Sequence, residues 1–201
     1  MKKKFFSQTH RSLQKVADGE RVADVLLEKR VHQIFTPEEK VFIEASHFFF
    51  IATATNDQID CSFKGGEAGF VRVTGPSQIT WPDYDGNLMF RTLGNIMENP
   101  NVSMIFVNFN DPSKVNSPKK IGKLRLNGKA KIVSPPTSNV DPAAKNTVVV
   151  DIDFILPNCP RYLPEIRFEK LSIYNPKPDY YPPEPEWKNR DYIKPLLKKR
   201  P

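Results

Sequence analysis

Two clusters of hydroxyl, amide, cationic and glycine residues are the best candidates for chemistry in this chain. One precedes a β-type run and the other ends a later run, and their members are Ser62, Lys64, Gly65 and Gly66, then Arg91, Thr92, Gly94 and Asn95. Glycine lets backbone N–H groups come close to an anion, and lysine and arginine supply positive charge. The clusters therefore predict a site for a phosphate or a similar anion. Such residues also occur in ordinary hairpin loops and on exposed strands, so composition leaves both interpretations open.

Other catalytic arrangements are not indicated by the sequence. The three histidines, His10, His32 and His47, stand early in the chain and apart from carboxylates at metal-site spacing. Neither a catalytic triad nor a metal centre is therefore expected. His47 stands at a predicted helix-to-strand junction and is interpreted as a capping or packing residue. The glycine-rich patterns of dinucleotide-binding folds and of phosphate-binding loops are both absent from the sequence, which sets those two folds aside.

Composition predicts one cytoplasmic domain with extensions and no membrane association. A chain of 201 residues can bury a core, and its longest apolar stretch, residues 47–54, has the length of a strand rather than of a membrane span. The basic residues 2–4 are followed by polar residues instead of the apolar stretch of a secretory signal. Cys61 and Cys159 form neither a disulfide framework nor a zinc pattern, so reduced thiols are expected.

The positive charge of the chain is concentrated at its two ends. The net charge is +7, of which residues 2–4 contribute +3 and residues 188–201 contribute +5. Residues 5–187 therefore carry about −1, and a basic groove for nucleic acid is not expected there. An OB-like nucleic-acid binder, in which aromatic residues on short strands stack on bases, is the third and least favoured of the functions considered.

Two segments before residue 47 have helical patterns. Residues 20–34 place apolar side chains among charged ones with the period of an amphipathic helix. Thr36 and Glu39 have the spacing of a capping box, and Pro37 stands at the first helical position. This second signal predicts a helix over residues 37–46.

From residue 47 the apolar period changes to two, which is typical of β-strands. Eight β-type runs follow, separated by Gly, Pro, Asn and Asp, at residues 47–55, 58–64, 69–74, 77–81, 87–92, 102–109, 121–133 and 147–155. Asn127-Gly128 predicts a tight hairpin turn within one of these runs, and residues 95–99 predict one helical turn. The pattern predicts a mainly β fold with peripheral helices, built as an antiparallel barrel of six or seven strands.

The last part of the chain has the composition of an extended arm. Seven prolines follow Asn175, and they prevent regular backbone hydrogen bonding. Tyr180, Tyr181 and Trp187 favour docking of this arm on the body or on a partner, because solvated tails rarely carry three aromatic residues so close together. The predicted organisation is a helical extension at 1–36, a barrel domain at 37–175 and a Pro-rich basic arm at 176–201.

Six motifs occur in one order, namely IATA at 51–54, CSFKGG at 61–66, GFVRV at 69–73, DGNLMFRTLGNI at 85–96, NPNVSMIF at 99–106 and LRLNGKA at 124–130. Together they resemble the pyridoxamine 5'-phosphate oxidase-like family of FMN-binding split barrels. The resemblance runs from about residue 37 to residue 170, and NCPRY at 158–162 is similar to a late motif of an uncharacterised flavin-nucleotide-binding branch. It implies a homodimer with two FMN molecules in clefts between the subunits.

The resemblance also implies which residues contact FMN. The candidate cofactor-binding residues are Ser62, Lys64, Phe70, Val71, Arg72, Val73, Arg91, Thr92, Asn95, Lys123 and Arg125. Residues 70–73 would run beside the flavin, with Arg72 facing its phosphate or ribityl chain. Asn95 would open a short helix whose N-terminal amides favour an anion. Lys123 or Arg125 would approach the ring from the partner subunit.

Two motifs of authentic pyridoxamine 5'-phosphate oxidases are missing from this chain. Those enzymes have a Ser-Arg-Lys phosphate clamp after the run equivalent to 88–92, where this chain has residues 94–96, Gly-Asn-Ile. They also have a C-terminal Arg-x-His motif, whereas no histidine follows His47 here. The phosphate charge must therefore be met elsewhere, and oxidation of vitamin B6 is not expected.

Two functions of different classes remain open. The first is an FMN-dependent oxidoreductase of unknown substrate, in which the cofactor carries out hydride or electron transfer. Cys159, Arg161 and Tyr162 are its candidate contacts with flavin or substrate, although Cys159 is also interpreted as a small buried apolar residue and the other two as loop packing. The alternative is a non-catalytic flavin-binding carrier, sensor or stress-associated module.

Overall fold

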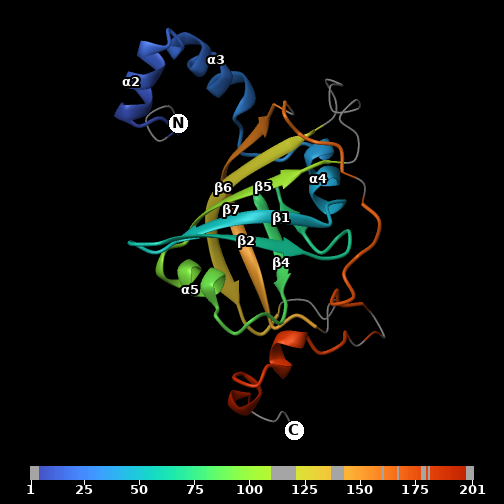
Figure 1. Ribbon diagram of the computed structural model, residues 1–201. Helices are drawn as coiled ribbons and strands as arrows, with labels where there is room; N and C mark the ends of the chain where they lie inside the picture. Colours follow the sequence, from blue (N-terminus) through green and yellow to red (C-terminus); the bar gives the residue numbers. More distant parts are fainter. Residues whose placement is uncertain are drawn as a thin grey trace.

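The computed structural model describes residues 5–109, 121–136, 143–159, 161–166, 168–177, 180 and 182–197. Within them, seven strands form one antiparallel sheet with the order β2-β1-β5-β6-β7-β4-β3. The strands are β1 Phe48–Ala54, β2 Ile59–Gly65, β3 Arg72–Gly75, β4 Gln78–Asp83, β5 Asn101–Val107, β6 Lys123–Val133 and β7 Asn146–Asn158. Figure 1 shows the curled sheet with helices at its periphery. The predicted mainly β split-barrel fold is therefore confirmed.

The barrel is open along one side. β2 and β3 stand at the two ends of the strand order, and among the described strands each pairs with one neighbour, β1 and β4 respectively. Strand twist curls an antiparallel sheet until its two ends come near each other. The opening between β2 and the β3–β4 pair is the split, and it contains the candidate site.

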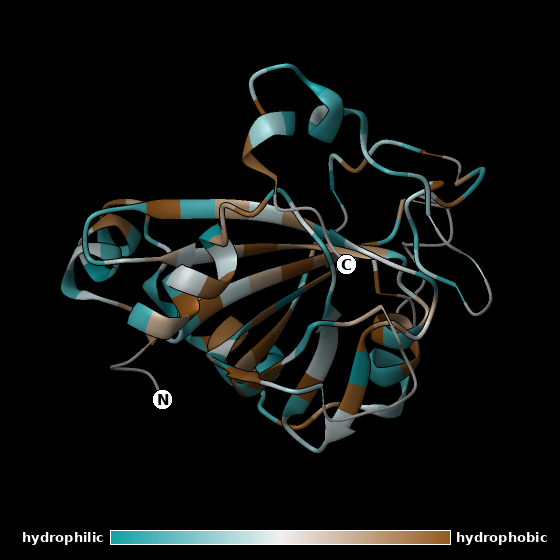
Figure 2. Cartoon of the chain, turned by 90° about the horizontal axis from the view of Figure 1, so that it is seen from below, coloured by the Kyte–Doolittle hydropathy of each residue, from teal (hydrophilic) through white to brown (hydrophobic). Residues whose placement is uncertain are grey.

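An aromatic cluster fills the interior of the barrel. The ring of the buried Phe49 on β1 has its centroid 5.1 Å from that of Trp81 on β4 and 5.1 Å from that of Phe106 on β5. Such aromatic contacts add to the free energy gained by burying apolar surface. Figure 2 shows the hydrophobic stretches concentrated on the strands. The cluster therefore joins strands from distant parts of the sheet into one core.

Asn127 and Gly128 lie within the continuous strand β6, so the predicted hairpin turn is wrong. β6 pairs with β7 on both sides of these residues, and the register shifts at them. A Cβ atom on Gly128 would lie only 2.2 Å from the carbonyl oxygen of Asp151. Glycine is therefore required here because two backbones approach closely at a β-bulge, not because the chain turns.

The helix predicted from the capping box is confirmed. α4 spans Pro37–Glu44, and the Thr36 side chain accepts a hydrogen bond from the Glu39 N–H while the Glu39 side chain accepts one from the Thr36 N–H. α3 spans Glu20–Arg30 and is shorter than the predicted helix over 20–34. The reason is that the backbone becomes extended at Val31 and His32 then forms a β-bridge with Ile155.

A helix that the sequence analysis did not predict precedes α3. α2 spans Gln8–Val16, and it begins at a capping box between Ser7 and the side chain of His10. Arg11 of α2 and Asp24 of α3 form an ion pair of 2.7 Å that connects the two helices. The N-terminal extension therefore contains a helical hairpin within its described residues.

The strand predicted at residues 87–92 is wrong. Leu88 and Phe90 have φ angles of 62° and 52°, which an extended strand does not allow. α5 begins at Arg91 and spans Arg91–Glu98, so Asn95 does not open this helix as predicted. Asn95 is buried in its middle, and its Nδ2 donates to Oγ1 of Thr53 at 3.0 Å. Asn95 therefore attaches α5 to β1.

The described part of the C-terminal arm has little regular structure beyond two short 3₁₀ helices, Glu186–Asn189 and Lys194–Leu196. The Tyr180 hydroxyl donates to the carbonyl of Ile173 at 2.8 Å, and Lys188 donates to Asp85 on the barrel at 3.1 Å. Tyr181 and the basic residues 2–4 and 198–200 lie outside the described residues. No helix in the described ranges is long and apolar enough to cross a membrane.

Candidate functional site

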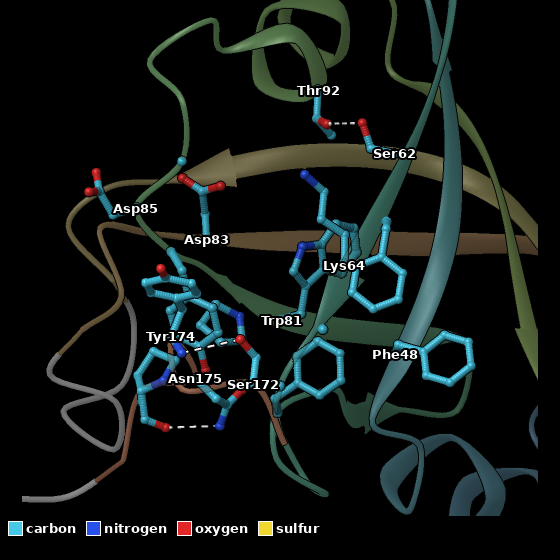
Figure 3. Close-up of a pocket in the computed structure, with 18 of the residues that line it drawn as sticks. Phe48, Ser62, Lys64, Trp81, Asp83, Asp85, Thr92, Ser172, Tyr174 and Asn175 are labelled. Atoms are coloured by element: carbon cyan, nitrogen blue, oxygen red, sulfur yellow. Dashed lines mark hydrogen bonds between the residues drawn. The ribbon is translucent and has the colours of Figure 1, made fainter. Parts of the chain in front are cut away.

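A cavity of about 810 Å³ lies in the split of the barrel. Its walls come from β2, from the end of β4 and the following loop, from the start of α5, and from residues 168–176. Figure 3 shows Ser62 and Thr92 together on one side and Ser172, Tyr174 and Asn175 together on another. Lys64 and Trp81 lie between these two groups in that view. The cavity therefore lies between the edge strand β2, the end of β4, the start of α5 and the C-terminal segment.

Three polar residues of β2 line the cavity. Asp60, Ser62 and Lys64 stand two residues apart and therefore share one face of the strand. Ser62 Oγ donates to Asp60 Oδ2 at 2.8 Å, and Arg91 Nε donates to Asp60 Oδ1 at 3.1 Å. Thr92 Oγ1 donates in turn to Ser62 Oγ at 3.1 Å. This network holds the start of α5 against β2.

The same network sets the ionisation of Asp60. The hydrogen bond from Ser62 stabilises its carboxylate, burial opposes this, and Arg91 adds a second hydrogen bond and a positive charge. Together these effects hold the pKa of Asp60 below its usual range. Asp60 is therefore a paired carboxylate whose charge Arg91 balances.

Lys64 differs from Asp60 and Ser62, the other two polar residues of β2 in the cavity. Its ammonium group makes no hydrogen bond or ion pair with the residues that the structure describes. Burial lowers the pKa of Lys64, and the carboxylates of Asp83 and Asp60 offset only part of that effect. A nearby anion favours the charged form of a buried lysine. An anion that enters the cavity would therefore gain a cationic partner there.

The first turn of α5 adds backbone donors beside this lysine. Residues 90–93 line the cavity, and the N-cap residue Phe90 makes no side-chain capping hydrogen bond. The first N–H groups of a helix have no acceptors within the helix, and they carry partial positive charge. These N–H groups form a polar end of the cavity that suits an anion, whereas the Thr92 hydroxyl already donates to Ser62.

Asp85 occupies a different corner of the cavity and is paired with two lysines. Lys145, just before β7, and Lys188, in the C-terminal arm, both donate to its carboxylate, the latter at 3.1 Å. Burial raises the pKa of Asp85, but the hydrogen bonds and charges of both lysines outweigh that effect and leave the pKa below its usual range. This corner therefore differs from Lys64, because both of its lysines already have a carboxylate partner.

Aromatic side chains form much of the remaining wall, and they are Phe48, Phe63, Phe70, Trp81, Tyr84, Phe90, Phe168 and Tyr174. His47 also lines the cavity, and its ring stacks on Phe168 with centroids 4.3 Å apart and planes 3° apart. His47 Nδ1 is buried without a hydrogen-bond partner among the described residues. Aromatic walls suit a planar ring, and the polar end suits an anion. The donor set therefore fits a planar ring system that carries a phosphate.

The structure brings five of the residues predicted to bind a cofactor into this cavity. They are Ser62, Lys64, Phe70, Arg91 and Thr92. Val71 is buried in the core instead, and the backbone N–H of Val73 donates to the Glu44 side chain at 3.1 Å. Arg72 is exposed on β3, and its Nε donates to the carbonyl of Gly69 at 3.3 Å. Residues 71–73 therefore do not line the cavity of their own chain.

The remaining candidate residues lie away from the cavity of their own chain. Lys123 and Arg125 are on β6, where they pair with residues of β5 and β7. Cys159 is exposed, so its interpretation as a buried apolar residue is wrong. Tyr162 is 91% exposed, with the Arg161 guanidinium 5.9 Å from the centre of its ring. These two side chains contact each other and do not line the cavity.

Several cavity residues were missed because their signals are weak in sequence. Asp83 and Asp85 follow a strand whose end was placed at residue 81, and residues 168–176 belong to a segment without periodicity. His47 was interpreted as a capping or packing residue, although its position just before β1 was a usable signal. No group of three metal-ligating side chains occurs among the described residues.

The sequence profile described as pyridoxamine 5'-phosphate oxidase matches residues 35–150, more than half of the chain. The chain belongs to the pyridoxamine 5'-phosphate oxidase family. The match extends from β1 into β7, and it therefore includes the polar residues of β2 and the start of α5. It does not cover residues 168–176, which form another wall of the cavity. A comparison with curated proteins found no match.

Solved structures that resemble the chain include HupZ of Group A Streptococcus, with 16% identity, 61% of this chain and 92% of HupZ covered, and a TM-score of 0.45. An FMN-binding protein of Syntrophomonas wolfei has 16% identity over 74% of this chain and 96% of its own, with a TM-score of 0.40. A FAD-binding protein of Mesorhizobium loti has 11% identity over 62% and 94% of the two chains, again with a TM-score of 0.40.

Proposed function

We propose that this member of the pyridoxamine 5'-phosphate oxidase family binds FMN in the split of its barrel and acts as an FMN-dependent oxidoreductase. The observation that carries the proposal is Lys64, a half-buried cation without a described partner, in a cavity that combines backbone donors with aromatic walls. A phosphate would meet the charge of Lys64, and a flavin ring would use the aromatic surface.

The residues of the chain divide the binding task between them. Lys64 and the first N–H groups of α5 would hold the phosphate, while Ser62 and Thr92, whose hydroxyls donate to Asp60 and Ser62, would keep β2 and α5 in place around it. Arg91 is already paired with Asp60, so its main role is to fix α5 and keep that carboxylate from repelling the phosphate. FMN, when bound, supplies hydride or electron transfer. The protein contributes binding, orientation and exclusion of water from the ring.

A homodimer is part of the same proposal, because the sheet exposes an aromatic patch beside the cavity. The patch consists of Phe48, Phe50 and Phe63, whose ring centroids lie 5.5–5.9 Å apart, and Phe63 is 60% exposed. Exposed apolar patches of this kind favour association. A second copy docked there would lie at the mouth of the cavity, which Phe48 and Phe63 also border. Lys123 or Arg125 could reach a cavity only from such a partner copy.

Dimer formation can be tested by light scattering during gel filtration. We expect the unaltered chain to have the mass of two copies and Phe63→Glu to have the mass of one, because a charge in the patch opposes its burial. Equal masses for the two proteins would exclude the patch as the interface.

A cytoplasmic location also belongs to this proposal, and the two exposed free cysteines favour it since thiols persist in a reducing compartment.

The oxidoreductase proposal is tested with the purified protein loaded with FMN. We expect yellow protein after gel filtration, and turnover of a nicotinamide nucleotide with a dye as electron acceptor. Bound flavin with negligible electron exchange would support the carrier or sensor alternative and exclude the oxidoreductase. A colourless protein that fails to retain added FMN would exclude both functions.

A further inference from the structure

Residues 168–177, here termed the cover segment, form a wall of the cavity that the family match does not include. Six of the cavity-lining residues after the family match are Phe168, Lys170, Leu171, Ser172, Tyr174 and Asn175. They follow β7, which ends at Asn158, and return along the chain's own barrel to the split. In Figure 3, Ser172, Tyr174 and Asn175 gather on one side of the cavity near Asp83 and Asp85.

The first half of the cover segment is attached where β1 begins. The N–H of Ile166, just before the segment, donates to the carbonyl of Phe109 at 3.1 Å. Phe168 then stacks flat on His47 at a centroid distance of 4.3 Å. Stacked aromatic pairs contribute beyond the burial of their area. This contact places both rings in the cavity wall.

The middle of the segment is a turn with its own hydrogen bonds. The N–H of Asn175 donates to the carbonyl of Ser172 at 3.0 Å, and the N–H of Tyr174 donates to Ser172 Oγ at 3.2 Å. Asn175 is buried, and its Nδ2 donates to the carbonyl of Pro176 at 3.2 Å. These bonds leave the ring of Tyr174 at the cavity as a preformed aromatic surface.

Contacts on both sides of the cavity hold the segment in place. Lys177 lies 3.9 Å from Glu67 in the connection between β2 and β3. Further along the chain, Lys188 donates to Asp85 at 3.1 Å, and its side chain is only 14% exposed. Asp85 lies in the loop between β4 and α5. The C-terminal arm is therefore fastened to both edges of the split.

We propose that the cover segment is a ligand-binding part of the site, with Tyr174 and the His47–Phe168 stack contacting the planar ring of the flavin while Lys188 fastens the arm over it. This inference rests on the proposed binding of FMN. It adds residues that the family match does not assign, and it means that one chain supplies both the phosphate end and a ring wall.

Two variants and two matched controls test the proposal on the full chain. Tyr174→Ala removes a ring contact, and Lys188→Met releases the arm from Asp85. Tyr192→Ala and Lys194→Met make the same changes at exposed positions of the arm that do not line the cavity. FMN affinity is measured by fluorescence titration, access to the bound ring by iodide quenching, and folding by circular dichroism.

We expect Tyr174→Ala to weaken FMN binding by about twofold to tenfold, as for the loss of an aromatic contact. Lys188→Met should weaken it by up to about fivefold, as for the loss of an ion pair. Both should make the bound ring more accessible to iodide, whereas the controls should match the unaltered chain. FMN should also slow amide hydrogen exchange in a peptide that covers residues 171–175.

The outcomes separate this inference from the function on which it rests. If the unaltered chain binds FMN but both variants bind it as tightly as their controls, with no change in iodide access or hydrogen exchange, the cover segment is not part of the site. In that case FMN binding itself stands. If the unaltered chain does not bind FMN, both proposals are wrong.

Discussion

β1 and β2 are neighbouring strands that use the same face of the sheet in opposite ways. Three opposed pairs connect them, Phe49 with Lys64, Ile51 with Ser62 and Thr53 with Asp60. Directly opposed residues of an antiparallel pair point to the same side of the sheet. The β1 members are buried in the interior, whereas the β2 members line the cavity. The buried core therefore ends at β1, and the neighbouring strand β2 already forms part of the cavity wall.

This difference shows how the fold makes room for a site. β1 has a paired neighbour on both sides, so its inward face is covered by the opposite wall of the barrel. β2 stands at the end of the strand order, where the split leaves its inward face open to the cavity. Polar side chains are tolerated there because a cavity admits water or a ligand. The sheet edge thus separates the buried residues of the core from the residues that line the cavity.

The largest expected effect is on the β1 side of this comparison. Phe49→Ala should lower the free energy of unfolding by about 3–5 kcal/mol, because it removes the ring that contacts Trp81 and Phe106 and leaves a cavity. Urea denaturation followed by circular dichroism measures this. A loss below about 1 kcal/mol would mean that the interior collapses around the missing ring and that β1 is not the structural strand of the pair.

On the β2 side the expected effect is on binding and not on stability. Lys64→Met should weaken FMN binding by about tenfold to a hundredfold, as for the loss of a charge-assisted hydrogen bond. The free energy of unfolding should stay the same or rise, because a half-buried charge is removed. Lys129→Met, an exposed lysine of β6, is the matched control. Equal titration curves for the two variants would remove Lys64 from the site.

A variant of Asn95 tests whether this residue belongs to the structural region or to the cavity. Asn95→Ala should lower the free energy of unfolding by about 1–2 kcal/mol, because it leaves buried Thr53 without the hydrogen bond that attaches α5 to β1. FMN affinity, measured at a temperature where the variant is folded, should change little. Weaker binding in a variant of unchanged stability would instead place Asn95 at the phosphate, as the sequence predicted.

The smallest expected effect is the pH dependence that Asp60 gives to stability. Its pKa is lower in the folded chain than in the unfolded chain, so its contribution is present above the usual carboxyl range and lost as pH falls through the lowered pKa. Asp60→Asn should flatten this acid part of the stability curve by less than about 1 kcal/mol. Identical curves from pH 2 to pH 6 would show that the contacts of Asp60 with Ser62 and Arg91 contribute nothing measurable.

The fold could be predicted largely from local patterns. Alternating apolar residues located the strands, and the capping box at Thr36 located α4, because both signals depend on neighbours in sequence. The errors arose where contacts between residues far apart in the sequence determine the local backbone structure. Gly128 lies against the backbone of a residue more than twenty positions away in the sequence. Leu88 and Phe90 adopt a left-handed backbone conformation, which their residue types do not predict.

The site could be predicted only in part for the same reason. Ser62, Lys64, Arg91 and Thr92 came from a cluster pattern and a family resemblance, and the structure brings them together. The pairing of Asp85 with Lys145 and Lys188 joins three distant segments. No sequence period could reveal such a contact, nor the return of residues 168–176 to the split.

The most direct test is a parallel titration of the unaltered chain and Lys64→Met with FMN and with riboflavin, which lacks the phosphate. We expect the unaltered chain to bind FMN at least about tenfold more tightly than riboflavin, and Lys64→Met to lose most of that difference. Equal affinity of the unaltered chain for the two flavins, or a preference for FMN that survives in Lys64→Met, would contradict a phosphate site at Lys64.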